Sequence, residues 1–231
     1  MSYKVLTVLG MLFLISAMQV TPLVYASSVS AGGAYSQSSP QLIASSVDSN
    51  VPNVVTATQA DLSTYVWQGA DTDTSYFLQE VLEDDYQPSG SSGWDIGFYG
   101  QNSNGQAIDN TWTNSLAQPG CTVLYDQSVT STNDIFADVQ QSSANGCTSM
   151  TQTYTFSDPN GSYGSYLSPI QLYLEWYDTN CSDYSGMGNV DFTSGSVENS
   201  YGTSSTPTYT AYYPQNGCFS STAGSGYVTI S

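Results

Sequence analysis

Short runs of alternating apolar and polar residues recur along the chain from Val51 to its end. Clusters of Gly, Pro, Asn, Asp and Ser separate the runs, and no segment keeps a 3.6-residue apolar period. Alternation with a period of two puts one side of a strand in the core. We therefore expect about eleven strands: Val54–Thr58, Ser63–Trp67, Ser75–Leu82, Trp94–Tyr99, Thr122–Tyr125, Ile135–Gln140, Thr151–Phe156, Ile170–Tyr177, Asn189–Phe192, Thr208–Tyr213 and Tyr227–Ile230.

This series of strands predicts an all-β fold, a single-domain antiparallel β-sandwich or jelly roll of the concanavalin-like kind, over residues 51–231. Tyr and Thr, which favour strands, are abundant, whereas runs of helix-forming residues are scarce. Residues 27–50 are rich in Ser, Ala and Gly with only scattered apolar positions, so we expect a flexible lead-in or a propeptide there.

Residues 1–26 have the features of a signal peptide for export. Lys4 supplies the charged start, Val5–Val20 is an apolar run, and Val24–Ala26 ends in a small residue suited to cleavage. An uncleaved membrane anchor is the alternative, and polar Ser16 and Gln19 within the run count against it. Cleavage after residue 26 would leave a chain long enough for one domain with a sizeable core.

The charge balance is extreme, because the chain has 19 acidic residues, a single basic residue and no His. The basic residue is Lys4, so the predicted mature chain has no cation with which to neutralise phosphates. This excludes nucleic-acid binding and disfavours binding to anionic membranes. At neutral pH the carboxylates repel one another, and protonation in acid removes that repulsion. The composition suits an acidic medium outside the cell, and a generic acidic surface protein shares that expectation.

The four cysteines of an exported chain predict two disulfides. Three pairings are possible, and we expect Cys121–Cys147 and Cys181–Cys218 because this pairing closes the shorter loops. A zinc site is not expected, since there is no His and no closely spaced pair of cysteines. No other motif indicates a cofactor.

Elimination restricts the chemistry that the chain can perform. Without His or a mature Lys, the Ser-His-Asp, Cys-His and Ser-Lys sites are excluded, and no Asp-Thr-Gly or Asp-Ser-Gly pair is present. The Gly-rich piece Gly97–Gly105 has no Lys and no helix after it, so it is not expected to bind phosphate. Asn160 and Asn180 each begin an Asn-x-Ser sequence and are candidate glycosylation sites. Carboxylate chemistry in acid is what remains.

One strand carries an acid in an unusual position. In Gln171–Asp178, QLYLEWYD, the two Leu and the Trp share one side, and Glu175 lies between Tyr173 and Tyr177 on the other. Glu is depleted in strands and costly to remove from water. The segment is therefore either an exposed strand face with one solvated acid or part of a site that uses Glu175.

A second stretch favours a site. Trp67–Leu82, WQGADTDTSYFLQEVL, resembles the glutamic peptidases (eqolisins), in which a Trp-x-Gly-x-Asp motif is followed by a Leu-Gln pair. The matching residues are Trp67, Gly69, Asp71, Leu78 and Gln79. Glu175, followed by Trp176, matches the segment that holds the family's Glu. The resemblance extends over roughly Val54–Asn199 and includes the segments Ile135–Phe156 and Asn189–Asn199.

The resemblance implies a β-sandwich with one Gln and one Glu on neighbouring strands and a polypeptide as substrate. Gln79 would stabilise the oxyanion, and Glu175 would act as general base and acid on the attacking water. Trp67, Asp71, Tyr173 and Tyr177 would contact the substrate, although Trp67 is equally consistent with a core tryptophan. The chain departs from the family at WDIGFY (Trp94–Tyr99), which lacks a Glu, and at Leu174, where a small residue is usual.

Two other functions remain open on the sequence alone. A non-enzymatic filament or adhesin subunit would assemble by donating its N-terminal segment as a strand to a neighbouring copy. A carbohydrate-binding sandwich would use exposed Tyr and Trp side chains. Gln79 and Glu175 side chains that lie close together on the concave face of one sheet favour the enzyme. A wide separation between them, or an unpaired edge beside an extended N-terminus, favours the subunit.

We predict that stability is greatest at low pH. With 19 acids and no cation to pair them, the folded-state pKa values should on average lie above the unfolded ones. Groups with raised pKa values stabilise the fold below their unfolded pKa, and this contribution is lost as the pH rises through the folded pKa. Melting temperatures between about pH 3 and 8 should therefore fall with rising pH, and a steady rise toward neutrality would contradict the prediction.

Overall fold

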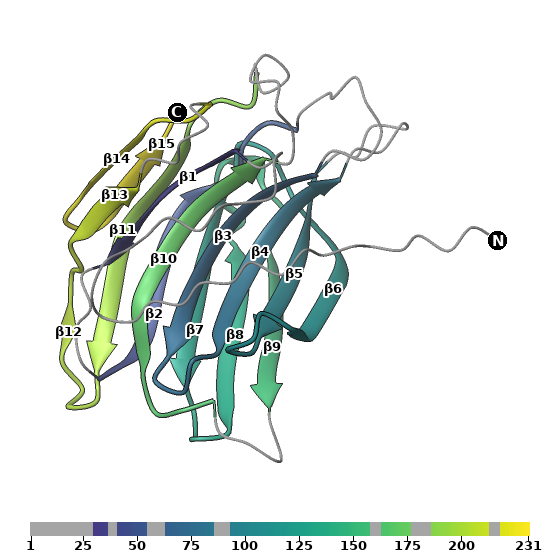
Figure 1. Ribbon diagram of the computed structural model, residues 1–231. Helices are drawn as coiled ribbons and strands as arrows, with labels where there is room; N and C mark the ends of the chain where they lie inside the picture. Colours follow the sequence, from purple (N-terminus) through teal and green to yellow (C-terminus); the bar gives the residue numbers. More distant parts are fainter. Residues whose placement is uncertain are drawn as a thin grey trace.

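The computed structural model describes residues 30–36, 41–54, 63–85, 93–157, 163–176, 186–212 and 218–231 (Figure 1). The predicted signal and most of the predicted strand Val54–Thr58 lie outside these residues. Within the described residues no helix is both long and apolar enough to span a membrane.

The described chain contains 15 β-strands, one short 3-10 turn at Ala144–Gly146 and no α-helix. The strands are β1 Ser30–Ser36, β2 Leu42–Asn50, β3 Ser63–Thr72, β4 Phe77–Asp85, β5 Trp94–Gln101, β6 Ala107–Ala117, β7 Thr122–Val129, β8 Asp134–Gln141, β9 Met150–Ser157, β10 Leu167–Trp176, β11 Val190–Asn199, β12 Ser204–Ser205, β13 Tyr209–Tyr212, β14 Ser221–Gly224 and β15 Tyr227–Ile230.

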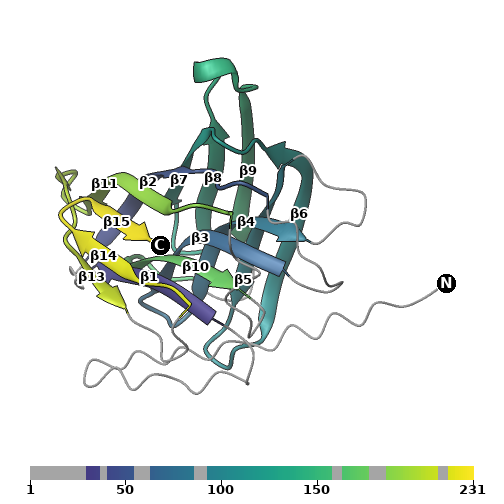
Figure 2. The same cartoon turned by 90° about the horizontal axis from the view of Figure 1, so that it is seen from above.

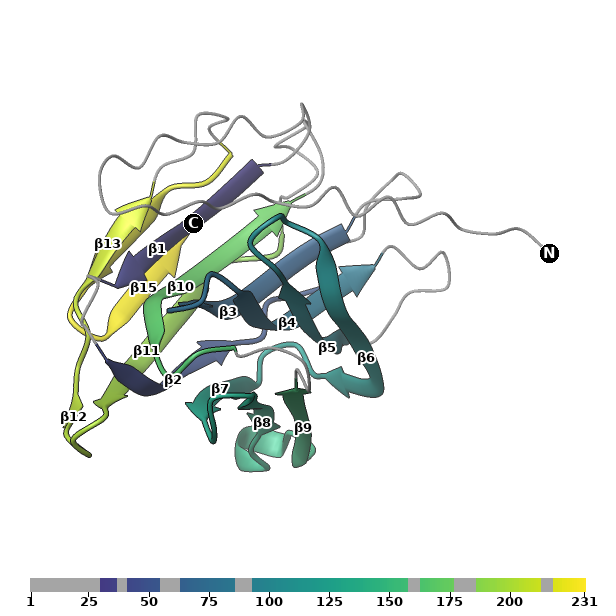
Figure 3. The same ribbon diagram turned by 60° about the horizontal axis from the view of Figure 1, so that its bottom comes forward.

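All strand pairs are antiparallel, and the hydrogen-bonded strands fold into two layers (Figures 1 and 2). The first layer has the order β13-β1-β10-β3-β4-β5-β6. The second has the order β14-β15-β11-β2-β7-β8-β9. A single pairing, Leu167 with Leu42, connects the layers. Figure 3 shows β7, β8 and β9 packed against one side of β3, β4 and β5. The prediction of an all-β sandwich is confirmed.

The prediction of a flexible lead-in at 27–50 is wrong for the described part of that segment, which forms β1 and β2. β1 lies between β10 and β13, and β2 lies between β11 and β7. The sequence hides β1 because its position requires very small residues. A Cβ added at Gly33 would lie 2.7 Å from the Tyr173 ring, and one at Gly32 would lie 2.8 Å from Phe219 and Ile230. The close neighbours leave room only for small residues, so β1 lacks the large apolar residues by which a strand is recognised in a sequence.

The sequence also misses β6, because the apolar residues of this strand face solvent. Ile108, Trp112 and Leu116 are each 38–39% exposed. β6 is the last strand in the order of the first layer, where one side has no neighbouring strand in the described chain. The short β12 and β14 were not predicted either, because Ser204–Ser205 and Ser221–Gly224 contain no large apolar residue that would mark an alternating pattern.

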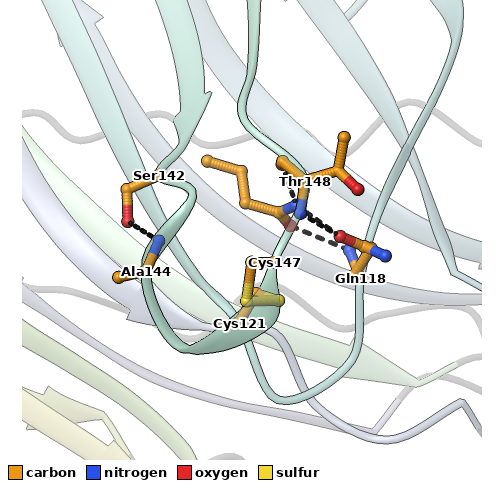
Figure 4. Close-up of a disulfide and its surroundings, with 7 residues drawn as sticks. Gln118, Cys121, Ser142, Ala144, Cys147 and Thr148 are labelled. Carbon is orange, nitrogen blue, oxygen red and sulfur yellow. Dashed lines mark hydrogen bonds between the residues drawn. A yellow bond between two sulfur atoms is a disulfide. The ribbon is translucent and has the colours of Figure 1, made fainter.

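A disulfide links the turn before β7 to the β8–β9 connection, as predicted. Cys121 and Cys147 are bonded, with Cα atoms 6.0 Å apart (Figure 4). The Gln118 backbone N–H donates to the Gln141 side chain at 2.8 Å, and Gln141 Nε2 donates to the Thr148 carbonyl at 2.7 Å. Cys218 is also disulfide-bonded, whereas its predicted partner, Cys181, lies outside the described residues.

The main core fills the space between the layers with large apolar side chains, among them Trp94, Phe98, Tyr125, Phe156 and Phe192. β10 contributes Ile170, Leu172 and Leu174, all fully buried. A second, smaller apolar cluster consists of Ala31, Trp67, Phe77, Val81 and Tyr173. These residues alternate with core residues along their strands, so the cluster lies on the opposite side of the first layer. We call that side the aromatic face.

We predict that Leu174→Ala lowers the free energy of unfolding by about 2–5 kcal/mol, because it leaves a cavity in a closely packed core. Leu116→Ala removes the same atoms from a half-exposed position on β6 and should cost less than about 1 kcal/mol. Denaturant unfolding of both variants would check this, and equal losses would contradict the assignment of Leu174 to the core.

Candidate active site

The residues matched to the glutamic peptidases are carried by three strands that lie side by side. β3 is the middle strand, with β10 on one side and β4 on the other. The register aligns Gln171, Gly69 and Gln79 in one row across the three strands. The next row contains Tyr173, Trp67 and Val81. Because side chains in such rows point to the same side of a sheet, both rows belong to the aromatic face.

Gln79 and Glu175 lie on the same face but not on neighbouring strands, because β3 separates β4 from β10. Gln79 is aligned with Gly69, and Glu175 is aligned with Tyr65. Their backbones are therefore offset by about 10 Å across the strands and about 13 Å along them. Trp67 occupies the intervening row on β3. The two offsets put the Cα atoms of Gln79 and Glu175 about 16 Å apart. Gln79 and Glu175 do not meet across this distance, and the buried Trp67 fills the space between them, so the separation does not meet the criterion that favours the enzyme.

Glu175 is a buried acid, with 5% of its surface exposed. Burial raises its pKa to about 7, because an ionised carboxylate loses hydration there, and the Trp67 side chain opposes this increase. The indole N–H lies close enough to favour the ionised form but falls short of full hydrogen-bond geometry. The small Ala31 of β1 lies opposite Glu175 on its other side.

Aromatic rings pack in series across the middle of this face. The Trp67 ring stacks on Tyr173 with centroids 4.8 Å apart, and Phe77 meets Trp67 edge-on at 5.4 Å. Tyr212 of β13 extends the series, 6.0 Å from Tyr173. Trp67 and Tyr173 are buried, and burial raises the pKa of the Tyr173 hydroxyl, which stays neutral. The rings therefore form an apolar layer between the side chains of Gln79 and Glu175.

Asp71 and Gln171 form a second polar pair on this face. Gln171 Nε2 donates a hydrogen bond to Asp71 Oδ2 at 2.9 Å. Burial nevertheless raises the pKa of Asp71 to about 7, with the bond from Gln171 opposing the shift. The Phe77 ring lies over Gly69, where an added Cβ would be 2.8 Å from the ring edge. Asp71 is thus a partly buried acid fixed by an amide, beside the row that contains Gln79.

Gln79 is half-buried on β4, and its side chain points away from the main core. Its neighbours Leu78 and Glu80 point into the main core, whereas Gln79 shares the aromatic face with Phe77 and Val81. Tyr99 of β5 lies opposite Gln79, and burial raises the pKa of its hydroxyl. Gln79 therefore has an aromatic neighbour and no cation beside it.

Several predicted residues lie outside the described residues: Tyr177, Asn160, Asn180 and Cys181. Among the described side chains, no group of three or more His, Cys, Asp and Glu could hold a metal ion. Sequence reasoning missed Glu80, which follows Gln79 directly and must therefore face the other side of β4. It also missed Trp112, whose ring lies over Gly97 at the edge of the aromatic face.

Comparison with known proteins identifies the fold. No protein-family model and no curated protein matches the sequence. Among solved structures, scytalido-glutamic peptidase with a transition state analog inhibitor is 19% identical, with a TM-score of 0.59 over 87% of this chain and 97% of that chain. SCP-B, a member of the eqolisin family in complex with the tripeptide Ala-Ile-His, is 17% identical, with a TM-score of 0.56 over 87% and 96%. The chain therefore has the β-sandwich fold of the glutamic peptidases.

We predict that Trp67→Phe raises the pKa of Glu175 above about 7, because it removes the N–H that favours the carboxylate and keeps an aromatic ring. A carbon-13 NMR titration of the Glu carboxyls, assigned with Glu175→Gln, would measure this. Trp112→Phe is the matched control and should leave the pKa unchanged. An unchanged or lower value in Trp67→Phe would show that Trp67 does not influence Glu175.

Proposed function

We propose that this protein is an exported acid endopeptidase of the glutamic type, with Glu175 and Gln79 as its catalytic pair. One observation carries the proposal: a chain with the glutamic peptidase fold has a buried Glu and a Gln on one face, at the residues that match the family's motifs. The related structures hold a transition state analog or a tripeptide. A polypeptide is the substrate class that follows from these likenesses.

A pKa of about 7 makes Glu175 a neutral carboxylic acid in an acidic medium. We infer that the carboxyl group of Glu175 donates one proton and accepts another in the same step. Its O–H gives a proton to the oxygen of the scissile carbonyl, while its other oxygen takes a proton from the attacking water. A tetrahedral diol forms, and Glu175 again holds one proton. The same carboxyl then protonates the leaving amide nitrogen and recovers a proton from the diol as the C–N bond breaks.

Gln79 contributes a neutral hydrogen-bond donor. Its amide N–H would bind the carbonyl oxygen while negative charge develops there, and this interaction is strongest in the transition state. A neutral amide neither titrates in acid nor needs a counterion, which suits a chain without cations.

The aromatic face suits an extended peptide. Trp67 and Tyr173 are buried, and the partly buried Tyr65, Tyr99 and Tyr212 around them keep surface that a peptide could contact. The Asp71–Gln171 pair would offer donors and acceptors to a peptide backbone. Asp71 and Glu175 are neutral below their pKa values of about 7, so in acid they do not repel an acidic substrate. Tyr177 is proposed as a further contact from the sequence alone.

The rival proposal, a filament subunit that donates its N-terminal strand, receives no support from the described N-terminal residues. β1 has both of its edges paired within the same chain, with β10 and β13. β2 likewise pairs with β11 and β7. A strand that completes its own sheet is not available to a neighbouring copy.

We predict that the purified chain digests unfolded proteins at about pH 3–4, with activity falling as the pH rises past about 7 and Glu175 loses its proton. Glu175→Gln should abolish the activity with little change in melting temperature. Gln79→Ala should lower kcat by about a hundredfold or more while peptide still binds, because the lost bond belongs to the transition state.

Glu198→Gln removes one carboxyl from β11 in the other layer and serves as the control, with wild-type activity expected. An inhibitor that requires a pair of catalytic aspartates should have little effect. If the unmodified chain digests nothing in acid, or if Glu175→Gln remains fully active, the proposed function is wrong.

A further inference from the structure

A second glutamate is buried more deeply than Glu175 and takes no part in the proposed reaction. Glu80 is fully buried on the inner side of β4, in the core between the two layers. Gln68 lies opposite it on β3, and Phe98 lies opposite it on β5. Neither carboxyl oxygen of Glu80 has a partner at full hydrogen-bond geometry, although the Gln68 side chain and the Glu80 backbone lie close enough to favour the ionised form. An acid in such a position is expected to have a specific reason.

The surroundings of Glu80 are polar, although no solvent reaches them. Gln68 is fully buried with both ends of its amide unpaired, and Gln127 of β7 is fully buried with Oε1 unpaired. Gln127 Nε2 donates to the carbonyl of Leu78 at 3.1 Å, which brings it across the core to β4. Ser45, opposite Gln127 on β2, is also buried and unpaired. We call Ser45, Gln68, Glu80 and Gln127 the buried glutamate cluster.

No charge is available to compensate an ionised Glu80. The chain has one Lys or Arg and no His, and that residue, Lys4, lies outside the described residues. The titratable groups that interact with it electrostatically are the phenol of Tyr125, which faces the core from β7, and the acids Asp126 and Asp138 on the outer side of β7 and β8. Asp84 is on the inner side of β4, four residues further along the strand. The facing residues of β3 and β5, Gln68 and Phe98, carry no charge. An ionised carboxylate in this place would be an unpaired buried charge, which is strongly destabilising.

We propose that Glu80 is a proton-binding switch inside the sandwich, which holds the two layers together when protonated and destabilises their contact when ionised. In the neutral form the carboxyl is both a donor and an acceptor, so it complements the unpaired amide and hydroxyl groups of the cluster. In the ionised form it only accepts, and its charge is repelled by Asp126 and Asp138, which are paired with each other on the outer side of β7 and β8. This inference concerns the core and is independent of the proposed peptidase activity.

The electrostatics agree with this geometry. Burial raises the pKa of Glu80 well above its usual 4.5, and the charges of Asp126 and Asp138 raise it further, against weaker opposition from the Glu80 backbone and Gln68. Burial and the neighbouring Asp138 also raise the pKa of Asp126, to about 6. A raised folded-state pKa means that the stabilisation is complete below the unfolded pKa and is lost as the pH rises through the folded one.

The test compares the wild-type chain with Glu80→Gln and with a control, Glu198→Gln. The control removes one carboxyl from a half-buried position on β11. Melting temperatures are measured from about pH 3 to 8. Glu80→Gln keeps the shape of Glu but cannot ionise. It should match the wild type below about pH 4 and melt higher above about pH 5, with the gap growing by roughly 3–5 °C per pH unit. Glu198→Gln should follow the wild type throughout. Parallel curves for Glu80→Gln and wild type would overturn the proposal.

A second measurement covers the case in which Glu80→Gln does not fold. The infrared spectrum of the folded Glu175→Gln, Asp71→Asn double variant at about pH 6 should still contain a protonated carboxyl band that exchanges slowly with deuterium, because a carboxyl buried in the core between the layers keeps its proton when surface acids have lost theirs. The two substitutions remove the other buried acids with pKa values of about 7. Absence of a slowly exchanging band at that pH would overturn the proposal without any change at Glu80. The peptidase proposal would stand in either case, since it depends on the opposite face of β4.

Discussion

The structure depends on one electrostatic constraint, which is that the described residues include no Lys, Arg or His to pair with the acids. The sequence has 19 acidic residues, one basic residue and no His, so an acid that leaves water must become neutral or be held by uncharged donors. Glu175 has the Trp67 indole beside it, Asp71 has the Gln171 amide, and Glu80 has only unpaired amides and a hydroxyl. In each case burial raises the pKa of the acid.

The same constraint connects the fold to the proposed chemistry through the two sides of the first layer. Gln79 and Glu80 are adjacent on β4 and point to opposite sides, one toward the aromatic face and the other into the core. Leu174 and Glu175 have the same relation on β10. Under the two proposals, protonation in acid would serve two purposes in one sheet: it would give Glu175 the proton that it transfers and keep Glu80 compatible with the core.

Small residues decide how closely the strands around the site can approach. Gly33 lies beneath the Tyr173 ring, Gly69 lies beneath Phe77, and Gly97 lies beneath Trp112. At each position a side chain would displace an aromatic ring of the face. The aromatic face thus depends on glycines that carry no chemistry themselves. The two consecutive glycines of β1 allow close packing on both sides of that strand, Gly33 against Tyr173 and Gly32 against Phe219 and Ile230.

The sequence by itself determined the fold class and the side on which Glu175 lies, because alternation along β10 requires the acid to oppose Leu172 and Leu174. It also indicated most of the strands from β3 to β11 and one disulfide. Only the tertiary structure decided that 30–36 and 42–50 are strands, because their small residues reflect close neighbours that are distant in sequence. The offset of Gln79 from Glu175 and the isolation of Glu80 were likewise undetermined, since both depend on the register and packing between strands and not on the pattern within any one of them.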